Sequence, residues 1–353
     1  MNLKTVGICT LGCKVNTYES EFVINKLKEK GYIIKDFDEI CDIYIINTCT
    51  VTNQADIKSR KMIRSAIKKN KEACVVAMGC FIEGNQKFQE EGVSIYLGNK
   101  NKSRIIEYIE EYYKKKETIK KQDTSLKTEF EDMYIDTFPG RTRAFVKIQD
   151  GCENFCSYCI IPYVRGKCRS KELSTVIKEV KALVANDYKE VVLTGIHTGN
   201  YGVDRNENFA DLLNELVKIK GLKHLRISSI EITELNNEVL AVLQKSKVIV
   251  DHLHIPLQAG SDRVLSLMNR KYDLKYFKEK IKKIREIRPN ISITTDIIVG
   301  HPEEKDEDFL DTLKTAKELL FSKIHVFPYS IREGTKAAKM LRTNFSKYKR
   351  RKK

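Results

Sequence analysis

The stretch RAFVKIQDGCENFCSYC, residues 143–159, joins a short apolar run to three closely spaced cysteines. Cys152, Cys156 and Cys159 are spaced C-x3-C-x2-C. The apolar run is typical of a buried parallel β-strand, so the cysteines come just after its carboxyl end. In β/α barrels, the loops at the carboxyl ends of the strands carry the active site. The stretch therefore predicts the first strand of a β/α barrel, followed by a loop suited to catalysis.

Downstream of this stretch, strand-like and helix-like patterns alternate. Helical spacing of apolar residues occurs, for example, at 174–187 and 209–220. Eight β/α units usually need about 250 residues, so the length favours an open partial barrel of six units. The open side would admit a large substrate. Further strand patterns lie at residues 190–195, 224–230, 250–257, 292–300 and 323–330.

The first hundred residues show a separate α/β pattern. Continuous apolar runs at 5–10, 42–47 and 73–78 predict buried parallel strands. Residues 18–32 and 56–70 have apolar residues at helical spacing. Together these patterns predict a βαβαβ unit with a parallel sheet.

Composition places the domain boundaries. We expect an N-terminal domain at residues 1–113 and the barrel at 141–335. Residues 114–140 are polar, charged and aperiodic and end in Pro-Gly, which predicts a linker. Residues 336–353 form a basic tail, and the last fifteen residues hold eight Lys or Arg and no acid.

A cysteine follows each of the three N-terminal strands. These are Cys13, Cys49 and Cys80. Parallel strands place their carboxyl ends at one edge of a sheet, where open α/β sheets bind ligands, so the three thiols can converge. Gly12 and Gly79 directly precede two of them and permit tight turns. The pattern predicts a second three-cysteine cluster site; the alternative is three buried core cysteines.

Composition also narrows the class of protein. The 353-residue chain has ten cysteines, no apolar run of about 18 residues and no signal peptide pattern. We therefore expect a cytoplasmic protein without membrane partners, whose thiols bind metal, act in catalysis or pack in the core. The formal net charge is +16. A basic cluster on the helix expected near residues 56–70 suits a phosphate backbone, although a solvated face is the alternative.

Zinc and an iron–sulfur cluster compete for Cys152, Cys156 and Cys159. Structural zinc takes four ligands, often as two close pairs, but the next cysteine, Cys168, has no pairing cysteine beside it. Three thiolates on a four-iron cluster leave one iron open for another ligand. The spacing therefore favours a 4Fe-4S cluster.

The C-x3-C-x2-C spacing, with Tyr158 before the last cysteine, resembles the radical S-adenosylmethionine (SAM) enzymes. The upstream cysteines resemble the methylthiotransferases within that superfamily. More narrowly, the chain resembles the bacterial branch that modifies threonylcarbamoyladenosine beside the tRNA anticodon. The resemblance spans about residues 3 to 340 and rests on segments such as TLGCKVNTYESE, INTCTVTNQAD, VVLTGIHTGNYG and HLHIPLQAGSDRVLSLMNRKY.

This resemblance implies a tRNA-modifying transferase with two 4Fe-4S clusters and S-adenosyl-L-methionine. The cluster on Cys152, Cys156 and Cys159 would bind the cofactor and, with an electron from a reducing donor, generate a 5'-deoxyadenosyl radical. The cluster on the upstream trio would carry a sulfur that is methylated and then transferred to C2 of the adenine; the sulfur donor is not identified. The macromolecular partner would be the tRNA anticodon stem-loop.

The resemblance and the strand-end positions also suggest contacts with the cofactor. Arg270 would face the methionine carboxylate, because a guanidinium fits a carboxylate bidentately. An ordinary turn is the alternative for the glycines, and a solvated helix end for Arg270. The expected cofactor-binding residues are Tyr158, Gly195, Gly199, Ser229, Glu231, Gln258, Arg270 and Val299.

Two departures from the family pattern stand out. Where the family usually reads VGFPGE, residues 299–304 read VGHPEE, so His301 and Glu303 would alter the loop after the fifth barrel strand. The family usually continues beyond residue 340 into a small RNA-binding β-barrel, the TRAM domain. Here we expect that domain to be absent and the basic tail to replace some phosphate contacts; a truncated gene is the alternative.

Three alternative functions stay open from the sequence. The same chemistry could act on another modified adenosine, or on a ribosomal protein. In an alternative of another class, the chain is a non-catalytic, metal-stabilised RNA-binding protein that holds zinc in place of iron.

Overall fold

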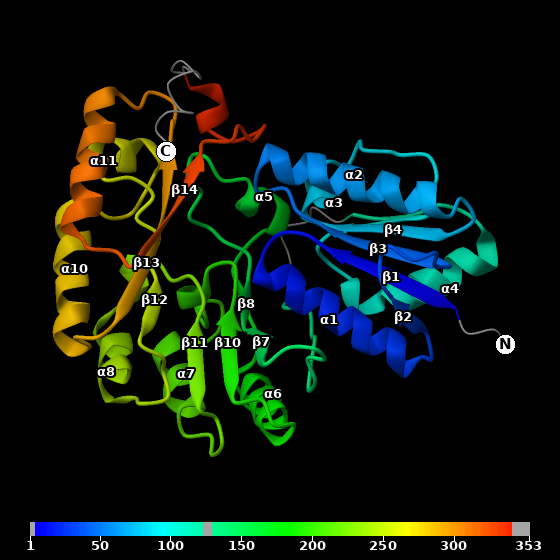
Figure 1. Ribbon diagram of the computed structural model, residues 1–353, viewed down its shortest axis with the longest axis horizontal. Helices are drawn as coiled ribbons and strands as arrows, with labels where there is room; N and C mark the ends of the chain where they lie inside the picture. Colours follow the sequence, from blue (N-terminus) through cyan, green and yellow to red (C-terminus); the bar gives the residue numbers. More distant parts are fainter. Residues whose placement is uncertain (1–3, 123–128, 341–353) are drawn as a thin grey trace. The chain divides into compact units, whose positions relative to one another are not determined.

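The computed structural model describes residues 4–122 and 129–340 (Figure 1). The chain divides into two compact units. The first runs to Phe138 and also includes Ile161–Lys167, whereas the second holds Pro139–Ile160 and the chain from Cys168 onward. This division differs from the expected boundaries, because a short segment directly after the C-x3-C-x2-C motif groups with the N-terminal unit.

A six-stranded parallel sheet forms the first unit, in the order β2-β1-β3-β4-β5-β6. This order reverses direction between β1 and β3, as in doubly wound folds of the 2-1-3-4-5 type. The strands are β1 (Thr5–Thr10), β2 (Ile33–Lys35), β3 (Ile43–Thr48), β4 (Cys74–Gly79), β5 (Ile95–Leu97) and β6 (Ile119–Lys121).

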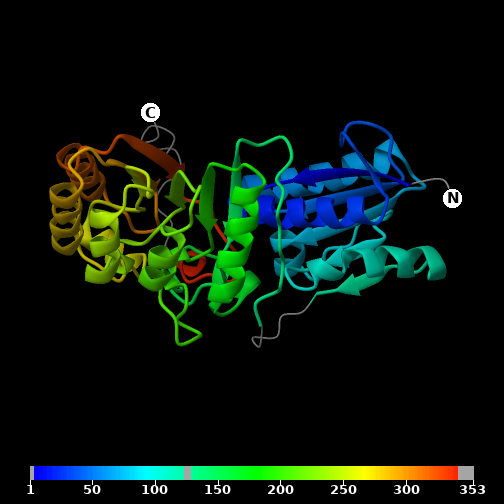
Figure 2. The same cartoon turned by 90° about the horizontal axis from the view of Figure 1, so that it is seen from below.

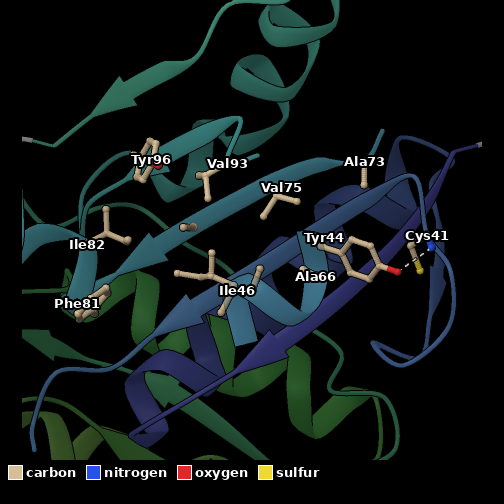
Figure 3. Close-up of a cluster of buried hydrophobic side chains, with 12 residues drawn as sticks. Cys41, Tyr44, Ile46, Ala66, Ala73, Val75, Phe81, Ile82, Val93 and Tyr96 are labelled. Carbon is tan, nitrogen blue, oxygen red and sulfur yellow. Dashed lines mark hydrogen bonds between the residues drawn. The ribbon is translucent and has the colours of Figure 1, made fainter. Parts of the chain in front are cut away.

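Helices cover both faces of this sheet (Figures 1 and 2). On the face covered by α2, the core brings together Ile46 from β3, Val75 from β4 and Ala66 from α2 (Figure 3). Thr52 caps α2, because its side chain accepts a hydrogen bond from the N–H of Ala55. The helices are α1 (Lys14–Glu29), α2 (Asn53–Lys69), α3 (Cys80–Gly84), η1 (Lys102–Arg104) and α4 (Ile105–Lys115).

Residues 114–140 were expected to be a linker, and the structure differs here. β6 adds the sixth strand to the sheet by pairing with β5. Met133, Ile135 and Phe138 are buried in the first unit. The polar composition hid these residues, because a few buried apolar side chains in an otherwise polar and charged stretch show no periodicity.

Six parallel strands form the barrel of the second unit and confirm the open six-unit partial barrel. They pair as two sheets, β11-β10-β7 and β12-β13-β14. Isolated parallel bridges, Leu225 with Ile249 and Ser229 with His254, connect the β11 region to the β12 region. The strands are β7 (Arg143–Lys147), β10 (Glu190–Thr194), β11 (His224–Ile227), β12 (His252–His254), β13 (Ser292–Val299) and β14 (Lys323–Pro328).

Four helices of the second unit begin at polar capping residues. Asn208, Asn236, Ser261 and Asp273 each accept a backbone hydrogen bond at the start of a helix. No helix in the described ranges is long and apolar enough to cross a membrane. The main helices are α6 (Leu173–Ala185), α7 (Phe209–Leu216), α8 (Asn237–Lys245), α9 (Asp262–Leu267), α10 (Leu274–Ile287) and α11 (Asp306–Glu318).

Candidate functional site

Cys49 and Cys80 continue two neighbouring strands at the same level. Thr48, the last residue of β3, pairs with Gly79, the last residue of β4. The Thr48 hydroxyl donates to the carbonyl of Met78 (2.6 Å), which fixes the two strand ends together. Each cysteine is the next residue along its strand, so the register itself brings the two positions side by side.

The turn that carries Cys13 lies against Cys49. Thr10 at the end of β1 pairs with Asn47 of β3, so Gly12 reaches the level of Cys49. A Cβ on Gly12 would lie only 2.8 Å from Cys49 Sγ, and Gly12 has φ +95°. The close approach therefore needs glycine, and Cys13 follows directly as the N-cap of α1.

These three positions surround the switch point of the sheet. Ligands of open α/β sheets bind outside the carboxyl ends of the strands where the strand order reverses, here between β1 and β3. Cys13 is exposed, whereas Cys49 and Cys80 are buried. Burial raises the pKa of Cys49 to about 11, so binding of a metal there must displace a proton.

The C-x3-C-x2-C cysteines lie in the loop between β8 (Gln149–Asp150) and α5 (Ile161–Arg165). All three thiols are partly exposed. The N–H of Cys159 donates to the carbonyl of Cys156 (2.9 Å), which closes a turn between two of them. Asn269, whose backbone is left-handed (φ 59°), donates its amide to the carbonyl of Phe155 (3.0 Å). Sequence reasoning missed Asn269, which holds the tip of this loop.

Arg270 donates to the sulfur of one of these cysteines. Its Nη1 lies 3.2 Å from Cys156 Sγ, and its Nη2 pairs with the carboxylate of Glu231. Burial raises the pKa of Glu231, although Arg270 opposes this effect. Two of the predicted cofactor residues therefore meet beside a cysteine of the motif. The predicted contact of Arg270 with a methionine carboxylate stays a prediction.

The two predicted glycines are explained by packing against protein side chains. A Cβ on Gly195 would lie 3.0 Å from Gln149 Oε1. At Gly199 a Cβ would lie 2.3 Å from Glu234 Oε2. These contacts account for both glycines without a cofactor, so their contact with the cofactor stays a prediction.

The remaining predicted residues lie at strand ends around the barrel. Ser229 follows β11 and bridges to His254. Gln258 follows β12, has φ 67°, and is joined to β13 through its backbone. Val299 ends β13 and is buried. Their positions match the strand-end expectation, and their contact with a cofactor stays a prediction.

His197 lies beside the cysteine loop. Its Nε2 pairs with Glu234, and its Nδ1 lies 3.9 Å from Cys152 Sγ. Burial alone would lower its pKa, but hydrogen bonds with Cys152, Cys168 and Glu234 raise the pKa of His197 to about 12. His197 is therefore a cation that orients the loop around Cys152.

The departure at His301 connects two loops of the second unit. Its Nδ1 donates to the carbonyl of Pro302 (2.9 Å), and its Nε2 accepts from the hydroxyl of Ser157 (3.1 Å). The ring also lies edge-on to Tyr158. Burial lowers the pKa of His301 to about 4, so the ring is neutral and this tautomer is fixed. The loop after β13 thereby supports the cysteine loop. The neighbouring departure, Glu303, has left-handed backbone (φ 66°).

Comparison with known proteins identifies the family. Residues 146–316 match the radical SAM superfamily, and residues 5–98 match an uncharacterized protein family, UPF0004. Over 96% of its length the chain is 45% identical to the threonylcarbamoyladenosine tRNA methylthiotransferase MtaB of Bacillus subtilis, covering 76% of that protein. The chain belongs to this methylthiotransferase family. The Aquifex aeolicus member is 41% identical over 95% of the chain and 82% of its own length.

Solved structures support the fold of this methylthiotransferase. The radical SAM methyltransferase TsrM from Kitasatospora setae aligns with a TM-score of 0.70 at 13% identity, over 96% of this chain and 77% of its own. At that identity the likeness concerns the fold alone. As a radical SAM methylthiotransferase, the enzyme uses S-adenosylmethionine and 4Fe-4S clusters.

Both cysteine trios have donor chemistry that fits an iron–sulfur cluster. In the described ranges, no three Cys, His, Asp or Glu side chains are already arranged as a metal site. The trios therefore match an iron–sulfur cluster by the chemical type of their ligands and not by their present geometry. At each trio a buried arginine aims an N–H at one sulfur: Arg270 at Cys156 (3.2 Å) and Arg165 at Cys80 (3.3 Å). Hydrogen bonds to sulfur are among the features that set the potential of such clusters.

Arg165 is the functional candidate that sequence reasoning missed most completely. It stands in the segment IIPYVRG after the cysteine motif, where it reads as an ordinary basic surface residue. The sequence did contain a signal, but it lies in the residues that contact Arg165. Asn16 and Glu19 follow Cys13 at helical spacing within α1 and are polar residues on a buried face.

Proposed function

We propose that the enzyme transfers a methylthio group to C2 of N6-threonylcarbamoyladenosine next to the tRNA anticodon. The product is 2-methylthio-N6-threonylcarbamoyladenosine, and the reaction takes place in the cytoplasm. The observation that carries this proposal is the 45% identity to the Bacillus subtilis enzyme over 96% of the chain. The cysteines of both trios lie within residues 5–98 and 146–316, which the two family models match.

Cys152, Cys156 and Cys159 would hold the cluster that binds S-adenosylmethionine. When both are bound, the cluster and S-adenosylmethionine supply the radical chemistry at the adenine. The protein's own residues orient the loop: Asn269 holds its tip and Arg270 donates to Cys156.

Cys13, Cys49 and Cys80 would hold the second cluster. Cys13 is the N-cap of the 16-residue helix α1, and the positive end of the helix dipole acts against the desolvation that raises the pKa of Cys13. Cys13 is also the exposed member, whereas the other two are buried. The trio would therefore present one open side toward solvent and substrate, with Cys49 and Cys80 behind it.

The expected cofactor contacts form part of the proposal. Glu231 and Arg270 are paired beside Cys156, so they would bind the polar groups of the methionine end. Ser229, Gln258 and Val299 lie at strand ends, and they would contact the nucleoside of the cofactor.

Another modified adenosine is the second candidate substrate. A Clostridium botulinum protein named tRNA-2-methylthio-N(6)-dimethylallyladenosine synthase is 35% identical over 96% of this chain. The lower identity makes this substrate the weaker candidate. A reducing electron donor and a sulfur donor are required by the chemistry in either case.

Nucleoside analysis tests the substrate. A deletion strain of a bacterium with the threonylcarbamoyladenosine enzyme is complemented with this chain, and its tRNA nucleosides are measured by mass spectrometry. We expect the 2-methylthio-N6-threonylcarbamoyladenosine peak to return with the chain and not with a Cys49→Ala variant. Methylthiolation of dimethylallyl- or isopentenyl-adenosine alone would reject the proposed substrate.

Metal content tests the cofactors. The anaerobically reconstituted protein should bind about eight iron atoms per chain, four in each cluster. A Cys152→Ala, Cys156→Ala, Cys159→Ala triple variant should bind about four. Stoichiometric zinc with no visible absorption would favour the non-catalytic RNA-binding alternative.

A further inference from the structure

A fully buried arginine contacts the N-terminal cysteine trio. Arg165 ends α5, in the segment Ile161–Lys167 that groups with the first unit. Its Nε donates to Cys80 Sγ at 3.3 Å. A guanidinium can only donate and stays protonated, so Cys80 Sγ must accept this hydrogen bond. A thiolate accepts from a cation more strongly than a neutral thiol does.

The other nitrogens of this guanidinium are fixed by residues of α1. Nη1 pairs with Glu19 Oε1 (3.0 Å), and Nη2 donates to Asn16 Oδ1 (2.8 Å). Asn16 Oδ1 is also 3.9 Å from the Sγ of Cys13. The Arg165 guanidinium therefore joins α1, the helix that follows Cys13, to the sulfur of Cys80. Because α1 fixes its two terminal nitrogens, Nε points at that sulfur.

A second buried cation shares the same carboxylate. Lys102 Nζ lies 2.5 Å from Glu19 Oε2, and Lys102, Arg165 and Glu19 side chains are all 0% exposed. Asn99 extends the network, since its amide lies 3.5 Å from Cys80 Sγ, and its backbone N–H donates to Glu83 (2.7 Å). Burying ion pairs is costly, so a network of this kind beside a thiol is more typical of a functional site than of a purely structural one.

We propose that Arg165 is a positioning residue for the N-terminal trio, whose guanidinium donates a charged hydrogen bond to the sulfur of Cys80 and thereby stabilises the iron–sulfur cluster. This inference rests on the proposed function, because it assumes that the trio holds such a cluster. The placement explains why a segment separated from Cys159 by Ile160 alone joins the first unit. The N-terminal site thus takes a ligand-stabilising residue from the chain directly after the other trio.

Arg165 also has a counterpart at the other trio. Arg270 donates to Cys156 Sγ at 3.2 Å, close to the 3.3 Å of the Arg165 contact. Donors to the sulfurs raise the potential of an iron–sulfur cluster, because they stabilise its more negative reduced state. Removal of the arginine should therefore lower the potential of the N-terminal cluster and weaken its retention.

The experiment isolates this cluster. The Cys152→Ala, Cys156→Ala, Cys159→Ala chain is reconstituted anaerobically with iron and sulfide, and Arg165→Gln and Arg165→Lys are introduced into it. Two readouts are independent of enzyme activity: the rate of iron loss to a chelator and the midpoint potential of the cluster by redox titration. Arg169→Gln is the matched control, since Arg169 is a buried arginine paired with Asp150 in the second unit.

We expect Arg165→Gln to lose iron about tenfold faster and to shift the potential to a more negative value. Arg165→Lys keeps the positive charge but loses the planar set of guanidinium donors, so its iron-loss rate and its potential should lie between those of Arg165→Gln and the parent. The control should match the parent. Parent-like iron loss and potential in Arg165→Gln would overturn the inference while leaving the proposed function intact.

Two further outcomes are separable. A parent triple variant that binds no iron would refute the second cluster itself, and the inference with it. If circular dichroism shows Arg165→Gln to be unfolded, Arg165→Lys decides: a potential and iron-loss rate equal to those of the parent would overturn the inference, and a shift in both would support it.

Discussion

Among single residues, His301 makes two hydrogen bonds that an apolar aromatic side chain at the same position could not make. It is buried, neutral and hydrogen-bonded to Ser157, which lies between two cysteines of the motif. The sequence identified His301 as a departure but not its contact, because Ser157 and His301 are far apart in the chain. The contact depends on how the loop after β13 folds back on the cysteine loop.

His301 should make stability depend on pH. Burial lowers its pKa from the ordinary 6.5 to about 4. The unfolded chain therefore binds the extra proton first, and stability falls as the pH drops from about 6.5 to about 4. Between pH 7 and pH 5 this loss amounts to about 2 kcal/mol. His301→Phe should lose less stability over that interval than the parent does in urea denaturation, whereas His224→Gln, at an exposed histidine, should behave like the parent.

The pair formed by Arg270 and Glu231 should respond strongly to the loss of one partner. Arg270→Met leaves the Glu231 carboxylate buried without its cation, which should lower the free energy of unfolding by about 3 kcal/mol. Glu231→Gln in the same background should recover part of that loss, because the unpaired charge is gone. Denaturant unfolding of the four chains in the cycle measures the coupling, and strictly additive effects would contradict the pairing.

At the scale of elements, the register of β1, β3 and β4 decides where the cysteines meet. Continuous apolar runs predicted these three strands to within one residue at each end. The six barrel strands were also predicted, but their predicted ranges extend up to three residues beyond the observed ends. The short strands β2, β5 and β6 gave no such signal, because three residues are too few to show a pattern. The positions of the three N-terminal cysteines at neighbouring strand ends could be predicted for the same reason, because each cysteine follows an apolar strand of six residues.

The turn from β4 to α3 should be intolerant of a side chain. Gly79 has φ +99°, and a Cβ there would lie 2.7 Å from Asn47 Oδ1 and 2.8 Å from the carbonyl of Thr48. Gly79→Ala should therefore lower the free energy of unfolding by more than about 2 kcal/mol and reduce iron binding at the adjacent Cys80. Gly140→Ala is the matched control, because Gly140 has φ +75° with no atom within 4 Å of the added Cβ. Its cost should be about 1 kcal/mol. Equal losses in denaturant unfolding would contradict the close packing at Gly79.

At the scale of the whole molecule, charge is the property that suits a nucleic-acid substrate. The net charge of +16 includes the basic tail, whose residues 341–353 lie outside the described ranges. Within the first unit, α2 carries a basic cluster and begins shortly after Cys49. Composition could predict this positive charge, but it could not predict which basic side chains are free to bind phosphate. Only the structure shows which of them form ion pairs with acidic residues.

Some basic residues of the α2 cluster form ion pairs, and others are exposed. Arg64 pairs with Glu90 and Lys69 with Asp38, whereas Lys58, Lys61 and Lys68 are exposed. These three lysines lie on the helix that follows Cys49, and we predict that they contact phosphates of the bound tRNA.

Replacement of these three lysines should weaken tRNA binding through electrostatics. Each lost phosphate contact should lower the slope of log K against log salt by about 0.7 to 0.9, so Lys58→Gln, Lys61→Gln, Lys68→Gln should reduce it by about 2. Lys275→Gln, Lys282→Gln, Lys283→Gln removes three exposed lysines of α10 and has the same net charge. Filter binding at several salt concentrations separates the two variants: a flatter line for the α2 variant alone locates the RNA contact, and coincident lines would show that only overall charge matters.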